Sequence, residues 1–130
     1  MLLLPAYYGI CLMKFKVSRK KEESTSRLYI LEIIVDGHTV YKIGKASGAN
    51  CKQRMLQIVG SYFDVYRVTP EIRVVRDRPC NDVFTKETKC HNELALFRYI
   101  SEEIFSGHTE LFKTDKEKVI EVYERILGCE

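Results

Sequence analysis

Apolar residues form two runs that are joined by a short polar turn between residues 28 and 44. Residues 28–35 are rich in Leu, Ile and Val, which predicts a strand that is buried on both faces. Asp36-Gly37 follows, a pair typical of a tight hairpin because glycine accepts positive φ. Residues 39–44 then predict the returning strand of the hairpin.

A two-residue turn fixes the register of this hairpin. It pairs Leu31 with Lys42 and Tyr29 with Gly44. Because side chains alternate along a strand, Tyr29, Leu31 and Lys42 are expected on one face of the sheet. Tyr41 is expected on the opposite face.

Helical and extended patterns alternate along the rest of the chain, which predicts an α+β domain. Asn50 is a candidate N-cap for the first helix, and Gly60 is its expected end. The predicted elements are helices at 51–59 and 86–104, a helix that follows Asp115, a strand at 71–76 and a short extended piece at 109–112.

The longest predicted helix, 86–104, carries an apolar stripe that includes Phe97, Ile100 and Ile104. Glu93 lies four residues before Phe97 and therefore on the inward-leaning face of this helix. A buried carboxylate needs a cation, a hydrogen-bond partner or a metal ion. His91 lies about 200° around the helix from Glu93 and is expected to point away from it.

The chain of 130 residues is long enough for one domain with a real core. We expect a single domain over residues 27–130, preceded by an apolar and basic arm or leader at 1–26, with Met13 as an alternative translation start. The net charge of +3 permits a nucleic-acid partner without requiring one. The dense basic residues at 14–21 are either a phosphate-gripping arm or a solvated tail.

Five cysteines without regular spacing argue against a secreted disulfide framework. Free thiols in a reducing, intracellular compartment are the expectation, with cytoplasm and nucleus both open. Cys80, Cys90 and His91 provide only a weak zinc pattern. The apolar residues 1–13 are too few to cross a membrane, which needs about 20, so no membrane partner is expected.

Several short motifs occur in an order that resembles the GIY-YIG nuclease superfamily over residues 27–113. The resemblance is greatest to a phage- and virus-rich branch whose second signature reads Lys-Ile-Gly. The first signature is reduced, because the glycine normally found before its tyrosine is absent. The matching residues are Tyr29, Lys42-Ile43-Gly44, Arg54, Glu93 and Glu110-Leu111-Phe112.

The resemblance implies a small three-stranded antiparallel sheet flanked by helices, and metal-dependent hydrolysis of a phosphodiester. Glu93 would hold Mg²⁺, with Mn²⁺ as an alternative, and Arg54 would contact the scissile phosphate. Tyr29 would touch the attacking water or the base that activates it. A phenol ordinarily loses its proton only near pH 10, so this role needs a positive neighbour, either Lys42 or Lys45.

The identity of the general base stays open among three residues of the expected site. The candidates are Tyr29, a Lys42 of depressed pKa, and His91, although a structural role for His91 has the greater weight. Substrate contacts are expected from Lys45, Tyr41 and His91. Glu110 more often stabilises such a fold than it binds metal.

These observations predict a DNA endonuclease that cuts one strand per active site. A double-strand break then requires a homodimer or two successive nicks, and RNA stays open as a substrate. The main alternative is a catalytically silent nucleic-acid-binding module of the same fold. An interaction protein without a nucleic-acid role would leave the ordered motifs as coincidence.

Overall fold

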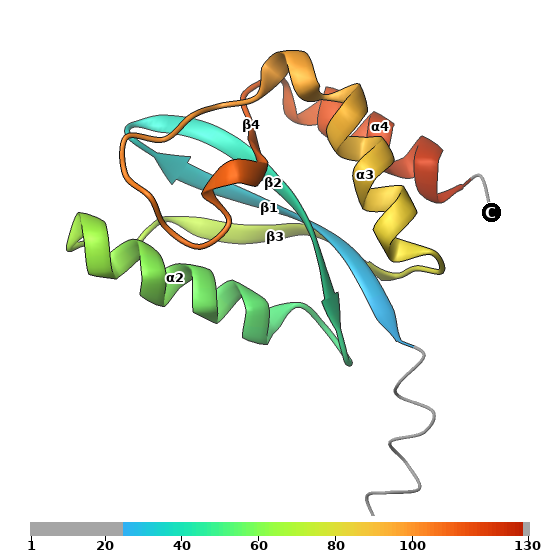
Figure 1. Cartoon of the computed structure of the whole chain (residues 1–130), viewed down its shortest axis with the longest axis horizontal. Coiled ribbons are helices and arrows are strands. Elements are labelled where there is room, and N and C mark those ends of the chain that lie inside the picture. The colour runs from blue at the N-terminus through green and yellow to red at the C-terminus, as the bar shows by residue number, and fades with distance from the viewer. Residues whose placement is uncertain (1–24, 129–130) are drawn as a thin grey trace, which may run out of the picture.

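The computed structural model describes residues 25–128 of the chain (Figure 1). The arm or leader expected at 1–26 lies outside these residues except for its last two, so its role stays a prediction. Ser26 already belongs to the first strand. None of the helices within 25–128 is long and apolar enough to cross a bilayer.

The sheet has four antiparallel strands in the order β3-β1-β2-β4. The α+β class is confirmed, but the expected three-stranded sheet is wrong by one strand. The piece at 109–112 ends in a strand that pairs with the hairpin edge at Tyr41 and Lys42. The strands are β1 (Ser26–Val35), β2 (His38–Ser47), β3 (Ile72–Pro79) and β4 (Leu111–Phe112).

The hairpin register is confirmed. Asp36 and Gly37 both have positive φ, 54° and 82°, as a two-residue hairpin turn requires. Tyr29 therefore pairs with Gly44, and Leu31 pairs with Lys42. This register places Tyr29 and Lys42 on a common face of the sheet.

Helices cover both faces of the sheet (Figure 1). On one face, α2 (Lys52–Tyr66) packs over Tyr29, Leu31 and Ile33. On the other face, α3 (Val83–Glu93) and α4 (Lys116–Leu127) pack over Leu28 and Ile30. Because β1 alternates between these two cores, its central residues are buried on both sides, as its apolar run predicts.

Helix α2 begins one residue later than the sequence predicts, with Cys51 instead of Asn50 as its N-cap, and it also ends later. The Asn50 side chain accepts a hydrogen bond of 2.9 Å from the Lys52 amide, which satisfies one free donor of the first turn. Gly60 does not end the helix. Arg67 does so instead, with a left-handed backbone at φ 63°.

The predicted helix 86–104 is wrong in its second half. Helix α3 ends at Glu93, and a short 3₁₀ turn follows at Ala95–Phe97. Beyond it, the Tyr99 amide donates to Leu111 O at 2.8 Å and the Lys113 amide donates to Phe97 O at 2.7 Å. This pairing with the β4 region replaces helical hydrogen bonds. Ile100 and Ile104, expected in the core, are therefore 82% and 75% exposed.

Asp36 connects the hairpin turn to α2 and to the segment before β4. Its carboxylate accepts hydrogen bonds from Tyr66 Oη at 2.6 Å, Tyr99 Oη at 2.7 Å and the Glu102 amide at 2.9 Å. Partial burial alone would raise the pKa of Asp36, but these donors outweigh it and hold the pKa below its ordinary value.

We expect Asp36→Asn to destabilise the fold by about 1–2 kcal/mol at pH 7 because it weakens the acceptor that three donors share. Asparagine tolerates the left-handed backbone, so the turn itself is not strained. The folded-state pKa is depressed, so the stabilisation is present above the unfolded pKa of about 3.9 and is lost as pH falls through the folded pKa. Urea unfolding at pH 7 and below pH 4 should show the difference between the proteins shrinking in acid. Asp64→Asn, at an exposed position of α2, is the control. An equal loss at both pH values would contradict the assignment.

Candidate active site

A buried lysine lies at the centre of the candidate site. The Lys42 side chain is 1% exposed, and its ammonium donates to Glu110 Oε1 at 2.7 Å and to Tyr29 Oη at 3.2 Å. Strand register positions Tyr29 and Lys42, while β4 places Glu110 immediately before Leu111, the partner of Lys42. A charge this deeply buried needs such partners.

Two glycines make room for this lysine. A Cβ on Gly44 would lie 2.4 Å from Tyr29 Oη and 2.5 Å from Lys42 Nζ. A Cβ on Gly107 would lie 2.5 Å from Lys42 Cε, and Gly107 also has a φ of 90°, which disfavours other residues. The glycine of the Lys-Ile-Gly motif is therefore required by the close approach of the phenol and the ammonium.

Helix α3 lies against the open edge of β2. Strand β4 pairs only with Tyr41 and Lys42, so the carbonyl of Ile43 is left for another donor. His91 Nε2 binds Ile43 O at 2.7 Å. A carbonyl oxygen only accepts, so Nε2 carries the hydrogen, and Nδ1 is the nitrogen that can act as a base or ligand when it carries no proton. Glu87, four residues earlier on α3, lies on the same side of the helix.

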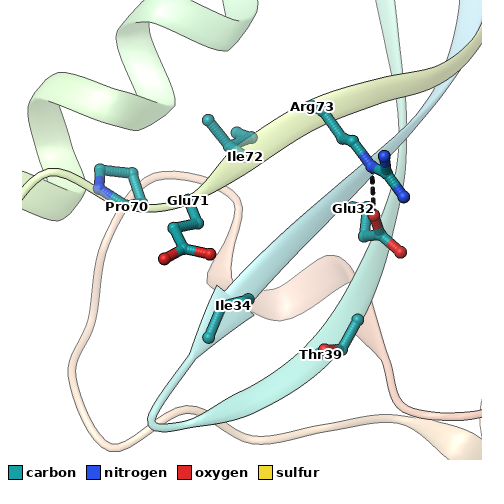
Figure 2. A pocket seen from close by; sticks show the side chains of 7 residues that line it. All are labelled: Glu32, Ile34, Thr39, Pro70, Glu71, Ile72 and Arg73. Carbon is teal, nitrogen blue, oxygen red and sulfur yellow. Dashed lines mark hydrogen bonds and ion pairs between the residues drawn. The ribbon is translucent and has the colours of Figure 1, made fainter.

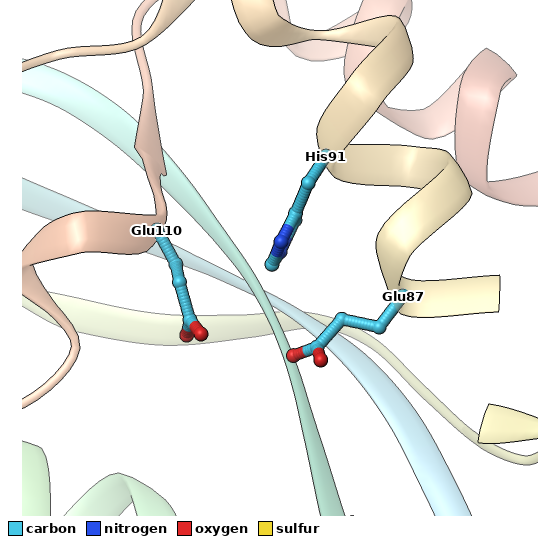
Figure 3. A group of neighbouring side chains, drawn as sticks. All are labelled: Glu87, His91 and Glu110. Atoms are coloured by element: carbon cyan, nitrogen blue, oxygen red, sulfur yellow. The ribbon is translucent and has the colours of Figure 1, made fainter. Parts of the chain in front are cut away.

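Glu87, His91 and Glu110 converge beside this edge (Figure 3). One ligand atom from each lies within 4.8 Å of the other two. Glu87 is buried and its Oε1 lies 3.3 Å from Lys45 Nζ. Two carboxylates and an imidazole are a donor set that divalent cations accept. Within the described residues this is the one such group of three.

The electrostatic balance keeps Glu110 ionised. Its partial burial would raise the pKa, but the adjacent ammonium of Lys42, with smaller contributions from His91 and Lys45, holds the pKa below its ordinary value. The carboxylate is therefore charged at neutral pH and available as a ligand or as an anchor for Lys42.

Arg54 projects from α2 on the same face of the sheet as Tyr29. Its Nη1 donates to Gln57 Oε1 at 3.0 Å and to Ser106 Oγ at 3.1 Å. Both partners are neutral, and within residues 25–128 no carboxylate pairs with this guanidinium. Ser106 precedes Gly107, the residue that packs against Lys42, so Arg54 is held near the centre of the site.

Glu93 does not lie where the sequence predicts. It is exposed and forms a bidentate ion pair with Arg125 of α4. The Arg125 Nη1 and Nη2 atoms donate to the two Glu93 carboxylate oxygens at 2.9 and 2.8 Å. The expected inward position depends on Phe97 continuing the helical stripe, and α3 has ended before that residue. The expected angular separation of His91 from Glu93 does hold, because His91 faces the site.

Tyr41 also lies away from Tyr29 and Lys42, on the opposite face of the sheet. Its hydroxyl donates to Glu32 Oε2 at 2.9 Å, and burial together with this carboxylate raises the pKa of Tyr41 to about 12. Glu32 also pairs with Arg73 at the rim of a hollow of about 510 Å³ near the hairpin turn (Figure 2). This hollow shares no residue with the cluster of Tyr29, Lys42, Glu87, His91 and Glu110.

The T5orf172 domain family model matches residues 26–127. The chain belongs to the T5orf172 domain family. This phage-associated domain is related to GIY-YIG and HNH-like nucleases. Comparison with curated proteins and with solved structures finds no match. The matched range contains Tyr29, Lys42, Glu87, His91 and Glu110.

Sequence reasoning passed over Glu87 and Gly107. A signal for Glu87 is present, because Glu87-x-x-x-His91 puts a carboxylate and an imidazole on one side of a helix. Val83, Cys90 and Leu94 provide the true apolar stripe of this helix. Gly107 has no comparable signal in the sequence, because its role depends on Lys42, which lies 65 residues earlier in the chain.

We expect Gly44→Ala to destabilise the T5orf172 domain by about 1–3 kcal/mol because its methyl group overlaps a buried phenol and ammonium. Gly60→Ala is the matched control. Gly60 lies within α2 with no atom near its would-be Cβ, so alanine there should stabilise the protein by about 0.5–1 kcal/mol. Thermal and urea unfolding measure both effects. Similar behaviour of the two variants would contradict the close approach.

We expect Lys42→Met to destabilise the domain by about 3 kcal/mol because it leaves Glu110 without its cation. The double variant Lys42→Met/Glu110→Gln removes both charges and should be more stable than the sum of the two single effects predicts, by at least about 1 kcal/mol. Urea unfolding of all four proteins completes the cycle. Additive effects would show that the pair contributes no coupling.

Proposed function

We propose that this protein is a divalent-metal-dependent DNA endonuclease of GIY-YIG type that hydrolyses one strand per active site. The observation that carries the proposal is the convergence of Glu87, His91 and Glu110 beside the Lys42–Tyr29 pair. The relationship of the family to nucleases supports the substrate class. Glu87 takes the metal-binding role that the sequence predicts for Glu93.

The donor chemistry suits Mg²⁺ or Mn²⁺. Carboxylate oxygens satisfy Mg²⁺, and the imidazole of His91 is accepted more readily by Mn²⁺. A divalent cation held by Glu87 and Glu110 would supply Lewis-acid stabilisation of the phosphate charge. Lys45 Nζ lies 3.3 Å from Glu87 Oε1 and neutralises this carboxylate. Because the Lys45 side chain is 39% exposed, it could contact a substrate phosphate once a cation replaces it at Glu87.

The surrounding residues have separate tasks in this proposal. Arg54, whose present partners are neutral, binds the scissile phosphate as negative charge builds on it. Lys42 donates to a carboxylate and a phenol, so in this proposal it positions Glu110 and Tyr29 and is not the general base. Tyr29 and His91 remain as groups that accept the proton of the attacking water, and Nδ1 is the available nitrogen of His91.

One observation favours the catalytically silent nucleic-acid-binding module. Each carboxylate of the cluster already pairs with a lysine, Glu87 with Lys45 and Glu110 with Lys42. Such pairs neutralise the site without a metal ion. In that case the basic residues bind DNA phosphates, and no cleavage follows.

The decisive comparison uses two glutamates of the same helix. We expect Glu87→Gln to lower nicking of supercoiled plasmid by at least about 100-fold, because the metal-binding carboxylate is lost. Glu93→Gln removes only an exposed ion pair with Arg125 and should nick like wild type. Nicking is measured with Mg²⁺, with Mn²⁺ and with EDTA. Calorimetric titration of the same cations measures binding independently of cleavage.

The outcomes separate the two functions. Metal-dependent nicking lost in Glu87→Gln and kept in Glu93→Gln supports the endonuclease and its site. The reverse pattern would return the metal role to Glu93. DNA binding without nicking, by folded wild-type protein with either metal, would support the silent module.

A further inference from the structure

An exposed phenylalanine lies one helical turn from the candidate metal ligands. Phe84 is in the first turn of α3 and is 67% exposed. Glu87 lies three residues further along, so both side chains project from neighbouring positions of the helix surface. A single exposed apolar residue needs no explanation by itself, so its surroundings decide whether it has a role.

Phe84 borders a shallow hollow of about 330 Å³ beside the site. Lys45 forms part of the same wall, and its Nζ lies 4.5 Å from the centroid of the Phe84 ring. The same Nζ lies 3.3 Å from Glu87 Oε1. One ammonium therefore connects the aromatic ring to the candidate metal ligand. The lining residues are Ser26, Lys45, Ala46, Ser47, Val83 and Phe84.

The chemistry of this hollow suits a nucleotide. An aromatic face accepts a stacked base of any sequence, and a neighbouring ammonium binds the phosphate that follows it. The volume lies at the lower end of small-ligand sites, about 300–1,000 Å³, which suits one base rather than a duplex.

We propose that Phe84 is a base-stacking platform, and that it holds one unpaired nucleotide of the DNA strand next to the phosphate that the site cleaves. This inference rests on the proposed function and narrows its substrate. A base inside a duplex has both faces covered by its neighbours, so it stacks on Phe84 only where it is single-stranded or turned out of the helix. The preferred substrate is therefore single-stranded or branched DNA.

The chain contains no tryptophan, so Phe84→Trp creates a single fluorescent reporter at the platform. The full-length variant is titrated in EDTA with an eight-nucleotide oligothymidylate and with an abasic oligonucleotide of equal length. We expect quenching with the first and little change with the second, because both carry the same phosphates and only one carries bases. Leu96→Trp, at a position 94% exposed outside the hollow, is the control and should respond to neither.

A second experiment measures the affinity of Phe84 variants for DNA. Phe84→Leu keeps an apolar side chain and removes the aromatic face, so binding of the oligothymidylate should weaken by about 5- to 150-fold. Phe84→Tyr should bind like wild type. Binding of blunt duplex should change less than about 2-fold in both variants, because a paired base does not reach the platform.

The results distinguish this inference from the proposed function. If the fluorescence of Phe84→Trp does not change, or if the abasic strand quenches it equally, while DNA binding or nicking is intact, the platform alone is overturned. Base-dependent quenching in Phe84→Trp, together with a wild type that does not nick, keeps the platform and overturns the endonuclease. Absence of DNA binding by the wild-type protein overturns both.

Discussion

The ammonium of Lys42 is the group on which the rest of the candidate site depends. It is buried in the sheet, and Glu110 and Tyr29 supply the partners that a buried charge requires. Glu110 comes from the segment before β4, so this one ion pair also holds that segment against the hairpin. Gly44 and Gly107 are the spaces that the lysine requires. Gly44 of the Lys-Ile-Gly motif and Gly107 thus both leave the space that the buried Lys42 side chain occupies.

The hairpin was predictable because its determinants are local. Asp36-Gly37 sets a two-residue turn, and period-two alternation then places Tyr29 beside Lys42 without knowledge of the remaining chain. The final helix after Asp115 is likewise confirmed, and it buries Val119, Val122 and Ile126. Elements whose apolar stripe and boundaries lie within one segment are those that sequence patterns describe well.

The parts that were missed depend on distant segments. Phe97 and Ile100 follow helical spacing, but the backbone there pairs with residues 111–113 instead of completing a helix. The stripe of α3 that faces the core is Val83, Cys90 and Leu94, and Glu87 lies on that face instead of Glu93. Glu110 was expected to stabilise the fold, yet its partner is a lysine 68 residues away. No local pattern contains such a contact, and only the closed fold brings these groups together.

Lys42 and Lys45, which neutralise the carboxylates, differ in how tightly the protein holds their side chains. This difference gives them different roles. Lys42 is fixed by two partners and by two glycines, so replacing its contacts would require rearrangement of the core. Lys45 is 39% exposed and contacts Glu87 only at 3.3 Å. Movement of Lys45 to another anion leaves the buried Glu87 carboxylate without a counter-charge, so the exchange is favourable only when a cation takes the place of Lys45. In the proposed function, a phosphate that approaches Phe84 would compete for Lys45, and a cation would replace Lys45 at Glu87. Substrate and metal would in this way bind in the same step, without disturbance of the sheet.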